Sequence, residues 1–188
     1  VMRGMDVERV IEPGLPLGSP VYLETLRAVE ERGTAWSAAR QDRRLMMDGI
    51  ELAFLWPTDA ALRHPEDVND VSAVVLLRYG GFSALLTGDA SQGVEAALAA
   101  RYGDGLRADV LKAGHHGSRT ASSPAFLDRV RPELVVVSAG ARNRYGHPHR
   151  EVLDRLARRR IPVARTDLDG TVSIEVDPGG AEWRRIEP

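Results

Sequence analysis

Two apolar segments separated by two glycines constrain the fold of this chain more than any other feature. Residues 72–79 (SAVVLLRY) and 82–88 (FSALLTG) flank Gly80 and Gly81, and this pattern predicts a β-hairpin. Both arms are almost continuously apolar, whereas a strand with one face in water alternates apolar and polar residues. We therefore expect the hairpin to lie in a sheet that is covered on both faces.

The segments around this hairpin occur in an order typical of layered α/β proteins. Upstream, strands are predicted at 7–11, 34–39 and 50–57, and a helix at 19–33, for which Ser19 can be the N-cap and Pro20 suits the first turn. Downstream, the pattern predicts a helix from Asp89 to about residue 102, a strand at 108–113, a serine-capped helix at 122–131, a strand at 134–140 and a helix at 149–160. Residues 161–167 and 170–177 predict a closing pair of strands.

The composition limits the chemistry that this chain can perform. With 43% hydrophobic and 28% charged residues in 188, it is typical of a globular chain of one domain. Cysteine is absent, which excludes disulfides, thiolate metal ligands and cysteine nucleophiles. Any metal would be held by histidine, carboxylate and water. The net charge of -2 gives no overall argument for nucleic-acid binding, and no apolar run of 18 residues predicts a membrane span.

Polar side chains follow three successive predicted strands. Asp89 follows the second arm of the hairpin, a pair of histidines follows residues 108–113, and a loop with two more histidines follows residues 134–140. In layered α/β folds the sheet fixes such strand ends while their side chains remain free to converge. Four of the five histidines lie on two of these loops: His115, His116, His147 and His149.

Each of these residues also has a purely structural interpretation. Asp89 can be the N-cap of the following helix. His115 and His116 can bond to the backbone of their loop, because adjacent residues in an extended loop point in different directions. The segment His147-Pro148-His149 can be a helix-entry turn in which the proline fixes the geometry. Ser118 near His116 is compatible with a Ser–His nucleophile, but the sequence places no third group.

A divalent cation is the alternative that uses these residues together, because carboxylate and imidazole are suitable ligands for such ions. Asp89 and one histidine supply two ligands. A catalytic zinc generally has three protein ligands and an open position, and a two-metal site needs more. From the residues alone, the sequence therefore predicts half of a metal site.

Four ordered motifs resemble those of a known family. They are TGD at 87–89, LKAGHHGS at 111–118, NRYGHPH at 143–149 and TDLDG at 166–170. Residues 69–177 resemble the C-terminal metallo-β-lactamase-like domain of the ComEC family of bacterial DNA-uptake channel proteins, with a looser similarity upstream. The resemblance implies an α/β fold of the αβ/βα sandwich type with a metal site at one edge, in a single domain spanning residues 1–188. The early metal motif of that fold, His-x-His-x-Asp-His, does not occur in this sequence, so we expect the domain to lack part of its first half.

The resemblance also implies a role for individual residues. Asp89 matches the carboxylate that binds or bridges metal and takes part in catalysis. His115 matches the late histidine ligand, with His116 as the second choice. The expected cofactor is Zn²⁺ or Mn²⁺, with two ions in the intact domain.

Substrate contact and proton transfer are implied for the remaining residues of the motifs. Ser118 and Arg119 follow the histidine pair and are expected to face a phosphate. Asn143, His147 and His149 match the substrate-side loop, where phosphate contact and proton transfer are both open. We expect the catalytic proton transfer from His147 or His149, and substrate contacts from Ser118, Arg119, Asn143 and Arg144.

The implied reaction is metal-assisted hydrolysis of phosphodiesters by a nuclease that degrades one strand of incoming DNA, single-stranded or duplex. The expected location is the extracytoplasmic face of the bacterial cytoplasmic membrane, with a transmembrane channel in the same polypeptide and no stable membrane insertion by this segment. Two alternatives stay open. One is a non-catalytic DNA-binding or interaction module, with sequence-independent phosphate contacts from clustered arginines: Arg142, Arg144, Arg150 and Arg158–Arg160. The other is a metallohydrolase of another small ester, because fold alone does not choose the substrate.

Overall fold

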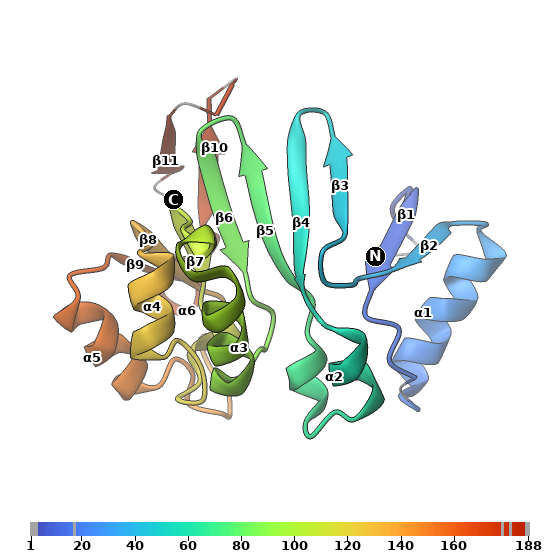
Figure 1. Ribbon diagram of the computed structural model, residues 1–188, viewed down its shortest axis with the longest axis horizontal. Coiled ribbons are helices and arrows are strands. Elements are labelled where there is room, and N and C mark those ends of the chain that lie inside the picture. The colour runs from blue at the N-terminus through green and yellow to red at the C-terminus, as the bar shows by residue number, and fades with distance from the viewer. Residues whose placement is uncertain (1–3, 17, 178, 181, 187–188) are drawn as a thin grey trace.

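A seven-stranded mixed sheet forms the centre of the computed structural model, which describes residues 4–16, 18–177, 179–180 and 182–186 (Figure 1). Its strands lie in sequence order. They are β3 (Arg44–Met47), β4 (Ile50–Trp56), β5 (Val74–Tyr79), β6 (Phe82–Leu86), β7 (Val110–Lys112), β8 (Leu134–Val137) and β9 (Val163–Arg165). The pairs from β3 to β6 are antiparallel and those from β6 to β9 are parallel. The predicted α/β fold class is confirmed.

The parallel half of the sheet is connected by helices, as parallel strands require. Helix α3 (Gln92–Tyr102) joins β6 to β7, α4 (Pro124–Val130) joins β7 to β8, and α5 (Arg150–Arg158) joins β8 to β9. Since these strands run in one direction, their carboxyl ends lie along the same edge of the sheet. The three loops that carry Asp89 and the four histidines begin at that edge.

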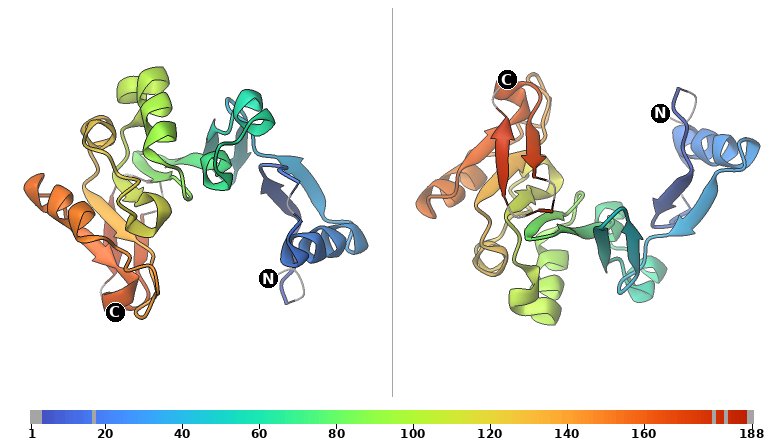
Figure 2. Two further views of the ribbon diagram at one scale, coloured as in Figure 1. Left: turned by 90° about the horizontal axis from the view of Figure 1, so that it is seen from below. Right: turned by 90° about the horizontal axis from the view of Figure 1, so that it is seen from above.

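Both faces of the parallel half are covered, which confirms the expectation for the hairpin (Figure 2). On one face, Leu85, Leu111 and Val135 pack with apolar residues of α3, α4 and α5. On the other, Phe82, Val110 and Leu134 pack towards a hairpin made of β10 (Ser173–Val176) and β11 (Trp183–Ile186). The alternation of Val110 and Leu111 between the two clusters follows from the two-residue period of a strand.

The N-terminal part forms a small unit beside the antiparallel half (Figure 1). Strands β1 (Arg9–Glu12) and β2 (Ala35–Ala38) pair in parallel, and α1 (Pro20–Glu31) joins them. Helix α1 begins after Ser19 as predicted, but the Ser19 side chain makes no capping hydrogen bond. Large apolar side chains of this unit and of the edge strand β3 are exposed: Val21, Leu23, Trp36, Met46 and Met47.

Several element predictions were wrong in detail. Residues 161–177 do not form a strand pair, because β9 pairs with β8, β10 pairs with β11, and α6 (Thr166–Asp169) separates β9 from β10. The helix expected from Asp89 begins at Gln92 with Ser91 as its N-cap. Strand β3, strand β11 and helix α2 (Asp59–Arg63) were not predicted. Three 3₁₀ turns complete the elements: Val68–Val71, Gly103–Leu106 and Gly114–Gly117. In the described part of the chain, none of the helices is long and apolar enough to cross a membrane.

Candidate functional site

Four imidazole rings and one carboxylate gather where the loops after β6, β7 and β8 meet. The ring centroid of His147 lies 5.6 Å from that of His115, 6.3 Å from that of His116 and 4.8 Å from that of His149. The Asp89 carboxylate lies against His116. The predicted convergence of the three strand ends therefore occurs, and Asp89 is not the helix N-cap that its position also allowed.

His115 and His116 lie in a tight turn and not in an extended loop. Their φ values are 47° and 57°, in the left-handed region that residues other than glycine rarely occupy. Two such residues in succession reverse the chain within the turn Gly114–Gly117. Neighbouring side chains in this conformation do not alternate as they do in a strand, and the two ring centroids are 6.3 Å apart. The costly backbone conformation is typical of functional sites.

His116 is oriented by a bond to the backbone. Its Nδ1 lies 2.7 Å from the carbonyl oxygen of Ser138, and a carbonyl only accepts, so Nδ1 carries the hydrogen. The other ring nitrogen, Nε2, lies 3.5 Å from Oδ1 of Asp89. Two ligands of a tetrahedral zinc ion are about 3.4 Å apart, given the usual Zn–N and Zn–O distances. Asp89 and His116 are therefore spaced as two ligands of one cation, with the carbonyl-oriented tautomer that metal-bound histidines have.

The described residues supply only those two ligands in suitable positions. No group of three or more histidine, aspartate or glutamate side chains in that part of the chain is placed to hold a metal ion. The structure brings His116, the second choice from the sequence, to Asp89, and places the ring of His115 next to His147.

Lys112 ties the first two loops together beneath these side chains. Its Nζ donates to the carbonyl oxygens of Gly88 at 3.0 Å and Ala113 at 3.2 Å. The backbone N–H of His115 donates to the same Gly88 carbonyl at 3.1 Å. Burial lowers the pKa of Lys112, and the nearby Asp89 carboxylate opposes this effect. This lysine was not assigned a role from the sequence, although the motif LKAGHHGS contains it.

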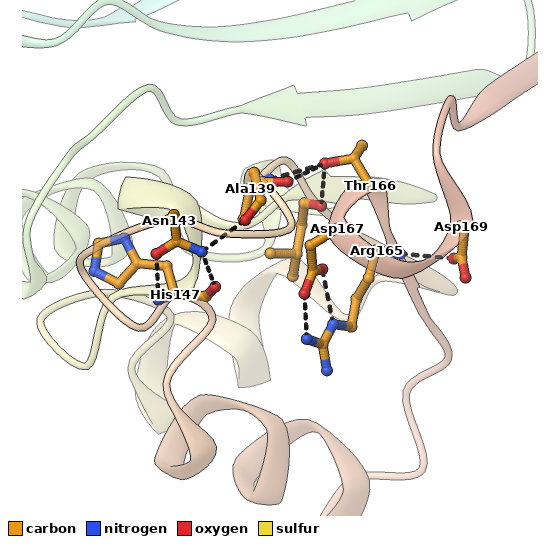
Figure 3. A network of polar contacts seen from close by, with 9 residues as sticks. Ala139, Asn143, His147, Arg165, Thr166, Asp167 and Asp169 are labelled. Atoms are coloured by element: carbon orange, nitrogen blue, oxygen red, sulfur yellow. Dashed lines mark hydrogen bonds and ion pairs between the residues drawn. The ribbon is translucent and has the colours of Figure 1, made fainter.

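Asn143 shapes the third loop from within (Figure 3). Its Nδ2 donates to the carbonyl oxygens of Gly140 and His147, at 2.9 Å and 2.6 Å, and its Oδ1 accepts from the backbone N–H of His147 at 2.9 Å. Thr166 fixes the start of the same loop, because its Oγ1 donates to the carbonyl of Ala139 and accepts from its N–H. A hydrogen bond from the Asn143 amide to a phosphate would have to replace one of its loop bonds, because both hydrogens of Nδ2 are already donated. Thr166 was part of a quoted motif but received no role.

The third loop packs closely on the second. The backbone N–H of His149 donates to the carbonyl of Gly117 at 3.0 Å. Gly117 has a φ of 82°, and a Cβ added there would lie 2.7 Å from Cβ of Pro148. Only glycine combines this conformation with this approach. Gly117 therefore allows the imidazoles of the two loops to share one site.

His147 and His149 differ in their surroundings. Burial is the main cause that lowers the pKa of His147, and the three neighbouring histidines lower it further, while Asp89 opposes them. His147 is therefore largely neutral at pH 7. The Nδ1 of His149 accepts from the backbone N–H of Arg119 at 3.2 Å, so the ring hydrogen of neutral His149 is on Nε2.

Ser118 is buried, whereas the neighbouring Arg119 is exposed to solvent. Ser118 is only 5% exposed and its Oγ lies 3.0 Å from Oγ1 of Thr120, within the turn. Arg119 is exposed, and its Nη1 lies 4.0 Å from Oε1 of Glu151. A substrate phosphate can therefore reach Arg119, whereas the hydroxyl of Ser118 stabilises the turn.

A cavity of about 450 Å³ opens beside the histidines. Its wall includes His116, Asn143, Tyr145, His147 and Thr166. This volume lies within the range of about 300–1,000 Å³ that is usual for ligand pockets. The site thus consists of a potential two-ligand metal position, further imidazoles and an adjoining pocket.

The chain is similar to bacterial competence proteins. It is 34% identical over 180 residues to Competence protein ComA of Neisseria gonorrhoeae, which covers 96% of this chain and 24% of that protein. It is also 34% identical over 172 residues to ComE operon protein 3 of Bacillus subtilis, covering 92% of this chain and 22% of that protein. The chain thus spans about a quarter of the length of these relatives.

Among solved structures, the chain resembles one from Parabacteroides distasonis that is named as a proposed metal-dependent hydrolase. The TM-score is 0.51 at 11% identity, and the match covers 89% of this chain and 80% of that one. At this identity the likeness concerns the fold alone. No family model matches the chain.

Proposed function

Because this chain belongs to the ComEC family of competence proteins and has a metallo-β-lactamase-like α/β fold, we propose that it is a metal-dependent phosphodiesterase domain. The reaction would be that of a nuclease that degrades one DNA strand during natural-competence DNA uptake. The observation that carries this proposal is the spacing of the Asp89 carboxylate and the carbonyl-oriented His116 imidazole, next to the neutral His147.

In this proposal Asp89 and His116 hold a divalent cation, Zn²⁺ or Mn²⁺, and the complete site takes two ions. The donor set fits, because a carboxylate and an imidazole with a free Nε2 are ligands that such ions accept. Water or other segments supply the remaining ligands. When bound, the cation lowers the pKa of a coordinated water and neutralises charge on the phosphate.

The surrounding residues bind the phosphodiester and move protons. Neutral His147 accepts the proton of the attacking water and, as an imidazolium, returns it to the departing alcohol oxygen, while the Nε2–H of His149 donates a hydrogen bond to a phosphate oxygen. The exposed guanidinium groups of Arg119 and Arg144 bind the phosphates on either side. Asn143 and Ser118 hold the two loops in the conformation that places these groups.

The setting belongs to the proposal as well. We place residues 1–188 in a single domain of a larger polypeptide, on the extracytoplasmic face of the cytoplasmic membrane and joined to a transmembrane channel. DNA would reach the site before or during its passage through the channel.

Metal-dependent cleavage of end-labelled single-stranded DNA tests the proposal. In excess Mn²⁺ or Zn²⁺ we expect Asp89→Ala and His116→Ala to lower the cleavage rate at least 100-fold, because each removes a ligand. Asp104→Ala is the matched control, since that carboxylate is exposed and pairs with Arg129 on another part of the surface. Full cleavage by Asp89→Ala would refute the proposal.

The two alternatives give different results in the same assay. Binding of DNA without metal-dependent cleavage would favour a DNA-binding module. Cleavage of lactones or small phosphodiesters, with DNA left intact, would favour another ester as the substrate. A comparison of the cleavage rates of His115→Ala and His116→Ala shows which histidine the reaction needs.

A further inference from the structure

Tyr145 is an exposed aromatic residue next to the candidate site. It is 61% exposed, and its ring is nearly parallel to that of His147, with an interplanar angle of 24° and 5.8 Å between centroids. The loop bonds of Asn143 fix the backbone on both sides of it, at Gly140 and His147. A large apolar ring is therefore held in solvent at a defined place, beside the group proposed to accept a proton.

The same ring lines the cavity of about 450 Å³. Part of the lining consists of small residues, Ser138, Ala139 and Gly140. A Cβ added to Gly140 would meet nothing within 4 Å, and its backbone is not in the left-handed region. The pocket thus combines an aromatic ring with a wall of small side chains that leaves room for a flat group.

Positive charge accompanies the ring. The Cζ of Arg144 lies 5.0 Å from the centroid of the Tyr145 ring, and its Nη2 donates to the tyrosine hydroxyl at 2.8 Å. Arg142 on the same loop is exposed. Aromatic rings beside arginines are the combination that binds single-stranded nucleic acids, because the base stacks while the cation contacts its phosphate.

We propose that Tyr145, with Arg144, forms a stacking subsite for one unpaired nucleobase of the substrate strand. This inference rests on the proposed function, and it adds the substrate class: single strands are preferred to duplexes. In a duplex both faces of a base are already stacked, so a base must leave the helix before Tyr145 can bind it. The bound base fixes the neighbouring phosphodiester next to His116 and His147.

Fluorescence of 2-aminopurine tests the subsite without any hydrolysis. Oligothymidylates with one 2-aminopurine at successive positions are titrated with the 188-residue chain in the presence of a chelator. Stacking on Tyr145 is expected to quench the fluorophore at one position only. Tyr145→Ala should abolish the position-specific quenching and weaken binding about tenfold, the size of effect usual for one lost stacking partner. Tyr145→Phe should keep the quenching.

Two further variants keep the test decisive. Gly140→Phe adds a large side chain to the lining of the pocket and is expected to reduce the quenching while Tyr145 is intact. Leu168→Ala removes a side chain that is 70% exposed on α6, outside the pocket, and should leave it unchanged. Quenching that survives Tyr145→Ala, or no binding of the oligothymidylate by the unaltered chain, would overturn the inference. If the chain shows position-specific quenching but never cleaves DNA, the proposed nuclease activity is refuted and the stacking subsite is supported.

Discussion

Lys112 helps to organise the candidate site although its side chain does not face the solvent there. It is the only lysine in the chain, while the other 24 basic residues are arginines. Its ammonium donates to the carbonyl of Gly88, which precedes Asp89, and to that of Ala113, two residues before His115. A compact ammonium on a flexible stem can reach both carbonyls, whereas the planar guanidinium of arginine is larger and fixed in shape. The residue type therefore fits a confined position between two turns.

We expect Lys112→Met to lower the stability of the chain and its metal-dependent cleavage together. Methionine keeps much of the apolar stem but loses both hydrogen bonds, and bonds to charged groups contribute about 1.5–3 kcal/mol each. The free energy of unfolding from denaturant titration should fall by a few kcal/mol. Cleavage should need more Mn²⁺, since the two turns are no longer tied.

Lys112→Arg keeps the positive charge, but its cleavage should still need more Mn²⁺ than that of the unaltered chain. The control is Arg129→Met, which removes a cation from an exposed ion pair. Unchanged stability and unchanged Mn²⁺ dependence in Lys112→Met would show that the ammonium does not position the site.

At the scale of elements, Glu95 joins α3 to the start of α4. Its carboxylate accepts from the backbone N–H groups of Ser122 and Ser123, and the residue is 1% exposed. Burial raises the pKa of Glu95, although these two bonds and the charge of Arg155 act in the opposite direction. The carboxylate thus anchors the segment that leads from the histidine turn into α4.

The stabilising effect of Glu95 should depend on pH. Because its pKa is raised above 4.5 in the folded chain, the folded state binds more protons than the unfolded state between 4.5 and the raised value. The contribution of this group to the free energy of unfolding therefore falls as the pH rises through that window. Glu95→Gln should remove this fall, as measured by denaturant titrations at several pH values.

Glu133→Gln, at an exposed position, controls for the substitution itself. The quantity to follow is the unfolding free energy of the unaltered chain minus that of Glu95→Gln. If this difference stays constant or increases as the pH rises through the window, the prediction is wrong. Glu95→Ala should be less stable by about 2–4 kcal/mol, since it leaves the N–H groups of buried Ser122 and half-buried Ser123 without an acceptor.

The sequence predictions were most accurate for elements that are determined by residues close together in the sequence. The arms of the β5–β6 hairpin and the strands β7 and β8 were predicted because each is built around a short, largely apolar run. Strand β9 has only three residues, and nothing local specifies that it pairs with β8 after a helical crossover. Strand β3 (RLMM) was missed because its short sequence does not alternate.

The sequence predicted which loops form the candidate site, but not which side chains in those loops face each other. Strand ends indicated where Asp89 and the histidines would meet, since that argument depends only on topology. Which histidine faces Asp89 depends on two consecutive left-handed residues, a conformation that the sequence pattern does not specify. The role of Thr166 depends on a contact with the distant Ala139, and Lys112 was predicted only as part of a strand.

At the scale of the whole molecule, the 188-residue chain is expected to bind metal weakly by itself. The described residues place two candidate ligands together, Asp89 and His116, and no third histidine or carboxylate among them completes the group. Calorimetric titration with Zn²⁺ should show an affinity well below that of a three-ligand site, and His116→Ala should abolish what binding there is. Tight stoichiometric uptake by the chain would contradict this expectation.

The change from antiparallel to parallel pairing at β6 also has a consequence for the order of folding. Strands β3 to β6 are neighbours in sequence and pair through short or moderate connections, and hairpins form in about 1–10 μs. Strands β7, β8 and β9 can join only after a helical crossover each, which brings together residues distant in sequence and is slower. We expect the loops bearing the imidazoles to come together only after the crossovers to β7 and β8 have formed. The candidate site is therefore expected to assemble late, in the parallel half of the sheet.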